Sequence, residues 1–138
     1  MKIADNRALP AFVHGAFRDA LASLDQEELA SVASSSDENG VPVEYLIATP
    51  AGMATASIEW VPWARGSGAA NIALNLVPWR DVTVTMAVSV RTDEAAQPTV
   101  NVRMGAADVM RIDAPAKGDR RRAFDDLRRV LMERMAGA

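Results

Sequence analysis

The sequence predicts an α+β fold: N-terminal helices, then a curled antiparallel sheet or partly open barrel of about six strands, closed by a C-terminal amphipathic helix. The first observation is a change of periodicity near Pro115. Residues from about 41 to 114 alternate with period two, as half-buried strands do, whereas residues 118–136 repeat with a period near 3.6. The second is that the period-two segments have short connections, which favour antiparallel hairpins over parallel crossovers.

The length and composition indicate one globular domain over residues 1–138. We expect a helical front at 1–40, an antiparallel sheet at 41–114 and a capping helix at 115–138. No apolar run reaches the roughly 20 residues of a transmembrane helix, so no integral membrane segment is predicted. Residues 1–5 (Met-Lys-Ile-Ala-Asp) contain no apolar h-region, which predicts no secretory signal and a cytoplasmic location.

The helical front is expected to contain two helices. Pro10 suits the first turn of a helix, because its missing N–H needs no partner there. An apolar stripe follows it, made of Phe12, Val13, Ala16, Phe17, Ala20, Leu21 and Leu24. Asp25 and Glu28 then have the spacing of a capping box, which predicts a second short helix through Val32. The polar segment 34–40 would separate these helices from the sheet.

Six segments have the character of strands, with one apolar and one polar face, as in an antiparallel sheet solvated on one side. They are about 43–48, 53–61, 71–76, 82–91, 99–104 and 108–113. Turns are expected at 50–52, at Gly66-Ser67-Gly68 and at the corner 77–81. Residues 93–98 are expected to form a polar loop that ends in proline.

The last helix is expected to run from Asp119, a suitable N-cap, to about Ala136. Its apolar stripe consists of Ala123, Phe124, Leu127, Val130, Leu131 and Met135. Its outer side carries ion pairs at i, i+4 spacing: Arg121–Asp125, Arg122–Asp126 and Arg129–Glu133. The stripe needs an apolar surface to cover, and the sheet supplies one.

The net charge of −3 is spread unevenly along the chain. It is −4 over residues 1–40, −2 over 41–114 and +3 over 115–138. We interpret the tail charges as a solvated helix face, because they alternate in sign; pairing of the acidic front with the basic tail between subunits is the alternative. Nucleic-acid binding is not predicted, since the arginines are interleaved with acids rather than with exposed aromatics.

Residues suited to catalysis are sparse. The absence of cysteine excludes disulfides, thiolate zinc sites and a cysteine nucleophile, and a single histidine, His14, excludes a histidine-rich metal site. Gly66-Ser67-Gly68 lacks the ending of a phosphate loop. Glu44 and Glu59 lie on strands expected to pair, on the same face or on opposite faces. We predict no catalytic residue, metal or cofactor, and we favour a non-enzymatic role.

The tryptophans are the strongest candidates for a binding site. Trp60, Trp63 and Trp79 lie near prolines that mark strand ends. Packing at the end of a curled sheet is the favoured interpretation. The alternative is an aromatic rim for a partner or small ligand, because tryptophan is enriched in binding hot spots. Arg65 and Arg80 each follow a Val-Pro-Trp sequence and would add polar anchors to such a rim.

Three segments resemble a bacterial pleckstrin-homology-like (PH-like) domain over about residues 43–136. They are Tyr45-Leu46-Ile47-Ala48-Thr49-Pro50-Ala51-Gly52, Val77-Pro78-Trp79-Arg80-Asp81-Val82 and the helix 119–136. The resemblance implies a curled antiparallel barrel plugged at one end by the helix, and a role in binding partners or lipids. Lipid-binding members have a basic first hairpin loop, whereas residues 49–53 contain no basic residue, so phosphoinositide binding is not expected. The leading hypothesis is a non-enzymatic protein-interaction or regulatory module with a protein partner or a homo-oligomer.

The order of elements is also similar to that of helix-grip proteins. This second resemblance implies an apolar cavity between helix and sheet that holds a small molecule, in a binding protein or a cyclase-type enzyme. The side chains expected to line the cavity are Val84, Met86, Val102, Met104, Phe124 and Leu131.

Overall fold

The structure, a computed structural model, describes residues 11–36, 42–62, 68–107, 109–115 and 118–136. Its elements are α1 (Ala11–Ser23), β1 (Ala30–Ser36), β2 (Pro42–Ala48), β3 (Gly52–Pro62), β4 (Gly68–Pro78), the 3-10 helix η3 (Trp79–Asp81), β5 (Val82–Arg91), β6 (Glu94–Met104), β7 (Met110–Asp113) and α2 (Asp119–Ala136). The predicted α+β class with antiparallel strands is confirmed.

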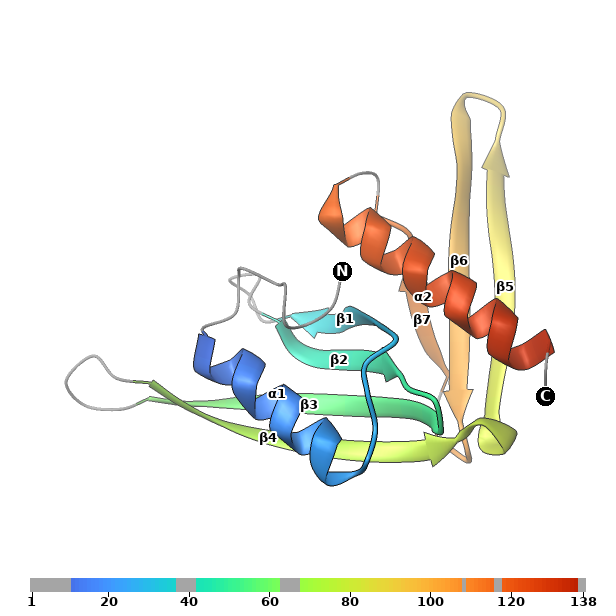
Figure 1. The fold of residues 1–138 in the computed structure, drawn as a ribbon. Coiled ribbons are helices and arrows are strands. Elements are labelled where there is room, and N and C mark those ends of the chain that lie inside the picture. The colour runs from blue at the N-terminus through green and yellow to red at the C-terminus, as the bar shows by residue number, and fades with distance from the viewer. Residues whose placement is uncertain (1–10, 37–41, 63–67, 108, 116–117, 137–138) are drawn as a thin grey trace.

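The seven described strands form two separate antiparallel sheets (Figure 1). The first has the order β1-β2-β3-β4 and the second the order β5-β6-β7, so within each sheet the strands pair with their neighbours in sequence. Because β4 is not hydrogen-bonded to β5, the strands do not close into a barrel. The predictions of about six strands and of one curled sheet are therefore wrong. The short helix η3 carries the chain from one sheet to the other.

The additional strand is β1, where the sequence predicted a second helix. Asp25 has a positive φ of 54°. Its N–H donates to the carbonyl of Ala22 at 2.9 Å, and the N–H of Gln26 donates to that of Leu21 at 3.0 Å. This pattern is a Schellman motif, which terminates a helix. Asp25 therefore ends α1 instead of capping a second helix, and the following segment pairs with β2.

Strand β6 begins at Glu94, so residues 94–98 belong to a strand and not to the predicted loop. Pro98 lies in this central strand, and its carbonyl accepts a hydrogen bond from the N–H of Ala114 at 3.1 Å. The N–H and C=O of one residue point to the same side of a strand, so the missing N–H of Pro98 points to the chain just beyond β7. The ladder has already ended there, which makes the proline tolerable.

Helix α1 packs on one face of the first sheet. Phe17 and Leu21 are the described α1 side chains buried there, and the rings of Phe17 and Tyr45 meet edge to face with centroids 5.7 Å apart. The strand residues buried in this layer are Tyr45, Ile47, Ala54, Ala56 and Ile58. The apolar stripe predicted for the first helix is thus confirmed at Phe17 and Leu21, whereas Ala16 and Leu24 are exposed.

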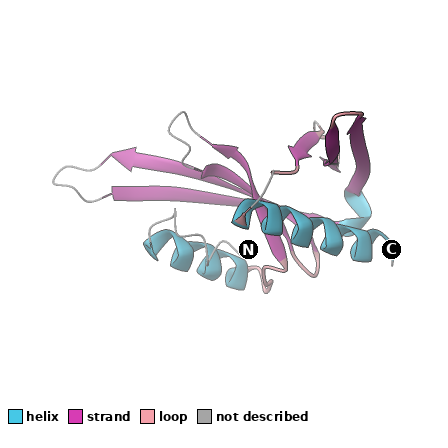
Figure 2. Ribbon diagram, turned by 90° about the horizontal axis from the view of Figure 1, so that it is seen from above, coloured by secondary structure: helices cyan, strands magenta, loops and turns pink. Residues whose placement is uncertain are grey.

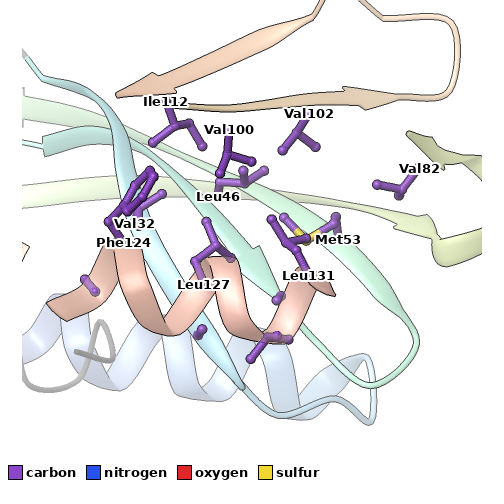
Figure 3. Close-up of a cluster of buried hydrophobic side chains, with 14 of the residues drawn as sticks. Val32, Leu46, Met53, Val82, Val100, Val102, Ile112, Phe124, Leu127 and Leu131 are labelled. Atoms are coloured by element: carbon purple, nitrogen blue, oxygen red, sulfur yellow. The ribbon is translucent and has the colours of Figure 1, made fainter. Parts of the chain in front are cut away.

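Helix α2 shares a second core with both sheets (Figure 3). Its buried residues are Ala123, Phe124, Leu127, Val130 and Leu131, as the predicted stripe requires. The first sheet contributes Ala30, Val32, Leu46, Ala48 and Met53, and the second contributes Val82, Val100, Val102, Met104 and Ile112. At roughly 2 kcal/mol for each large apolar side chain, this core is the main source of stability.

The outer face of α2 is charged. Arg121 pairs with Asp125 at 3.1 Å as predicted, and Arg129 pairs with Asp126 at 3.4 Å. In the part of the chain that the structure describes, neither helix is long and apolar enough to cross a membrane.

Gly52 gives a test of the contact between β3 and β4. A Cβ at this position would lie 1.9 Å from the carbonyl oxygen of Val77 and 2.9 Å from the Cα of Pro78. These are backbone atoms, so we expect Gly52→Ala to lower the free energy of unfolding by about 3 kcal/mol, the upper end for overpacking. Urea denaturation followed by circular dichroism would measure it.

The matched control is Gly105→Ala. Gly105 has a φ of 61° and no atom within 4 Å of an added Cβ, so only the backbone conformation is penalised, by about 1 kcal/mol. Equal stability of Gly52→Ala and the unchanged chain would contradict the close approach of β3 and β4.

Candidate partner-binding surface

Trp79 lies in η3, where the chain passes from β4 to β5. Its indole N–H donates to the carbonyls of Thr49 and Pro50, with Nε1–O distances of 3.0 and 3.2 Å. The side chain is half-buried and packs against the core beneath α2. Its polar atom is therefore satisfied inside the molecule, which agrees with the packing interpretation at this position.

The turn that Trp79 contacts joins β2 to β3. The buried hydroxyl of Thr49 donates to the carbonyl of Gly52 at 2.8 Å and accepts from its N–H at 3.2 Å. The side-chain oxygen of Gln26, from the loop after α1, accepts from the N–H of Ala51 at 2.9 Å. Both N–H groups of the turn thus have partners within the chain.

The backbone of Trp60 lies far from Trp79 along the β3–β4 hairpin. Trp60 pairs with Ala70, whereas Gly52, at the other end of β3, pairs with Pro78, the residue before Trp79. At about 3.3 Å per residue, the strand from 52 to 60 is about 26 Å long. These two tryptophans therefore do not occupy one end of the sheet.

The remaining predicted rim residues are arginines and one tryptophan. Arg80 is exposed, and its Nε lies 3.9 Å from the carboxylate of its neighbour Asp81. Trp63 and Arg65 lie outside the described residues. A partner-binding role for Trp60, Trp63 and Arg65 stays a prediction.

The side chains expected to line a cavity pack together in the second core. Val102, Met104, Phe124 and Leu131 are buried in one cluster. Val84 and Met86 are partly buried and pack against it. This arrangement gives no observation that favours the helix-grip hypothesis.

Glu44 and Glu59 share one face of the first sheet. Glu44 is directly opposite Ser57, which lies two residues from Glu59 on β3. The two glutamates are therefore diagonal neighbours, about 7–8 Å apart between Cα atoms. The carboxylate of Glu44 accepts a hydrogen bond from the hydroxyl of Ser34 at 2.9 Å.

Asp113 joins β6 to β7 through its side chain. The guanidinium of Arg111 and the hydroxyl of Thr99 both donate to Oδ1 of Asp113, each at 3.0 Å. These two hydrogen bonds, the one from Arg111 first, hold the pKa of Asp113 below its ordinary 3.8. The carboxyl is thus ionised at neutral pH, the opposite of what a general acid requires.

The hairpin β5–β6 exposes apolar side chains. On the apolar face of β5, Val82 is buried and Val84 and Met86 are half-buried, whereas Val88 is 53% and Val90 is 77% exposed. Figure 1 shows the reason: the hairpin extends well past the level at which α2 crosses it. Val88 and Val90 thus leave the outer half of the apolar face of β5 exposed.

Among the strands that the structure describes, β6 is the hydrogen-bonded neighbour of β5, and the other side of the β5 backbone is open. The carbonyl of Asp81 accepts from the N–H of Gly105, next to β6, at 2.7 Å. Odd-numbered residues of β5 therefore direct their N–H and C=O groups at β6, and even-numbered ones direct theirs outward. Residues 82–90 also contain no charge and no proline, the usual protection of an edge strand. We call this segment the β5 edge.

The first sheet has a comparable edge in β4, which is also uncharged. Its apolar side chains Ile72, Leu74 and Leu76, however, pack against the layer beneath α1. The β5 edge differs because its backbone and the outer half of its apolar face are both uncovered. Sequence periodicity predicted β5, but the extent of α2 over it depends on the angle at which the two cross.

No protein-family model matches the chain, and no curated protein and no solved structure matches it.

The role of the Trp79 indole can be tested with Trp79→Phe. This change keeps an aromatic ring but removes the donor to Thr49 and Pro50, so we expect the free energy of unfolding to fall by about 1–2 kcal/mol. Chemical denaturation monitored by circular dichroism would measure it. The control is the adjacent Arg80→Ala, which removes one exposed ion pair and should change stability by less than about 0.5 kcal/mol. Equal effects of the two changes would contradict this role.

The Asp113 carboxylate should make stability depend on pH. Its folded pKa is lowered, so its contribution is fully present above 3.8, the ordinary value, and is lost as the pH falls through the folded pKa. We expect Asp113→Asn to be less stable than the unchanged chain at neutral pH, with the difference vanishing in acid. Urea denaturation of both chains at neutral pH and in acid would measure this difference in stability. Thr99→Val, which removes one donor, should raise the pKa of Asp113 in an NMR titration.

Proposed function

We propose that this chain is a non-enzymatic protein-interaction module with a PH-like fold, and that it binds its partner along the β5 edge. The observation that carries the proposal is the uncharged strand of residues 82–90, whose outward backbone groups are open and whose outer valines, Val88 and Val90, are exposed. Addition of a partner strand at such an edge gains main-chain hydrogen bonds, and alternate side chains supply the specificity.

The arrangement of elements supports the PH-like part of the proposal. Antiparallel strands precede a C-terminal helix, and this helix packs into the space where two sheets meet (Figures 1 and 3). The two sheets are more open than the barrel that the resemblance implies, because β4 and β5 do not pair. That openness is what leaves β5 as an edge strand.

Two features favour a protein as the partner. The turn at 49–52 has no basic side chain, and its N–H groups at Ala51 and Gly52 are bonded to Gln26 and Thr49, so it offers little to a lipid phosphate. The exposed side chains of the β5 edge are apolar, whereas its backbone is polar. An extended peptide complements both properties.

Site-specific photocrosslinking tests this proposal. A benzophenone amino acid would replace Val90, and the full chain would be irradiated in its native cells. We expect a covalent adduct with a protein. The matched control places the same probe at Ala73, an exposed position of β4, where no adduct is expected.

A second variant separates binding from folding. The N–H of Val88 points to the open edge, so Val88→Pro should leave the β5–β6 ladder and the circular dichroism spectrum unchanged while the adduct at position 90 is lost. Equal adduct yields at positions 90 and 73, or an undiminished adduct in the Val88→Pro chain, would refute binding along this edge.

A further inference from the structure

We infer that the strand that covers the β5 edge is β5 of a second copy of this chain, antiparallel, with Met86 opposite Met86 across a two-fold axis. The inference rests on the proposed function, because it names the occupant of the same surface. Three properties of β5 support it: the direction of its backbone groups, the charges at its two ends and the gradient of exposure along its apolar face.

The backbone permits this pairing. The outward N–H and C=O groups of β5 belong to even-numbered residues, as the bond between Asp81 and Gly105 shows. With Met86 at the centre, Val84 of one copy lies opposite Val88 of the other, and Val82 lies opposite Val90. The hydrogen-bonded pairs along the join are even with even, so the open donors and acceptors meet one another, and odd-numbered residues form the non-hydrogen-bonded pairs between them. A two-fold axis perpendicular to the sheet also keeps both apolar faces on the same side.

The charges select the register. β5 has no charged side chain from 82 to 90, but Asp81 precedes it and Arg91 ends it. With Met86 opposite Met86, Asp81 of each copy lies opposite Arg91 of the other, and both residues are on the polar face. Non-hydrogen-bonded pairs of this kind bring side chains closest together. Any other register of the two strands separates both pairs of opposite charges.

The covered and exposed halves of β5 complement each other when two copies of the strand pair antiparallel. The base of the strand, at Val82 and Val84, is covered by the core beneath α2, whereas its outer half, at Val88 and Val90, is exposed. Antiparallel pairing places the exposed half of each copy beside the covered half of the other. Figures 1 and 2 show that the C-terminal end of α2 extends past the β5 side of the second sheet. A strand added at this edge would therefore lie in the same layer, next to that helix end.

A charge exchange tests the register. Asp81→Arg and Arg91→Asp each place like charges at both ends of the join, so each chain alone should have a dimer dissociation constant at least about tenfold above that of the unchanged chain. A mixture of the two variants restores both opposite-charge pairs in a heterodimer. Sedimentation velocity, with one variant labelled, would measure the dimer fraction in four samples: the unchanged chain, each variant alone and the mixture.

Mixing also separates the interface from effects within one copy. Arg91 is opposite Glu94 in its own hairpin, so Arg91→Asp changes that hairpin as well. Asp81 and Arg91 of one copy lie at opposite ends of a strand about 30 Å long, so recovery on mixing requires contact between copies. We expect the unchanged chain to be a dimer, the single variants to be mostly monomeric and the mixture to regain the dimer.

The outcomes distinguish this inference from the proposed function. A dimer that neither charge reversal weakens would overturn the β5–β5 pairing. A monomer whose position 90 crosslinks to a different protein would overturn the second copy as occupant and leave the β5 edge as a binding surface. A monomer with no adduct at position 90 would overturn both.

Discussion

The two hydrogen bonds of the Trp79 indole fasten the link between the two sheets to the turn between β2 and β3. Because β4 and β5 belong to different sheets, the placement of one sheet against the other depends on η3 and its contacts. Trp79 fastens η3 to the turn between β2 and β3, and the bond between Asp81 and Gly105 fastens it to the end of β6. The second sheet is thereby held over the apolar face of the first, and α2 fills the space between them.

The same junction explains why the proposed binding surface lies where it does. Once the angle between the sheets is fixed, α2 can pack where they meet, and its buried stripe shares a core with Val100, Val102 and Ile112. The helix crosses the hairpin β5–β6 near its base and leaves the outer part uncovered. The angle between the two sheets thus determines both which part of the second sheet α2 covers and which part of β5 stays exposed. The core of the molecule and its proposed interface therefore depend on the same angle.

Periodicity predicted α1, α2 and most strands, because each has an apolar face that repeats over many residues. Local patterns were less reliable. Asp25 and Glu28 match a capping box, yet a positive φ at Asp25 ends a helix instead. Proline is typical of loops, so Pro98 predicted one. It is tolerated in β6 because the side of the strand that bears its carbonyl, and would bear its N–H, faces the chain beyond the end of β7. The tryptophans could not be placed relative to one another from sequence, because the distance between Trp60 and Trp79 depends on the length and register of one hairpin.

The order of the elements has a consequence for synthesis on the ribosome. All strand pairs join sequence neighbours, so both meanders can form while the nascent chain is still emerging. Helix α2, which completes the core, comes last and packs against β1, near the beginning of the chain. Until its final turns leave the exit tunnel, the apolar faces around Leu46 and Val100 have no cover. The nascent chain therefore exposes aggregation-prone apolar strands until the C-terminal helix packs against them.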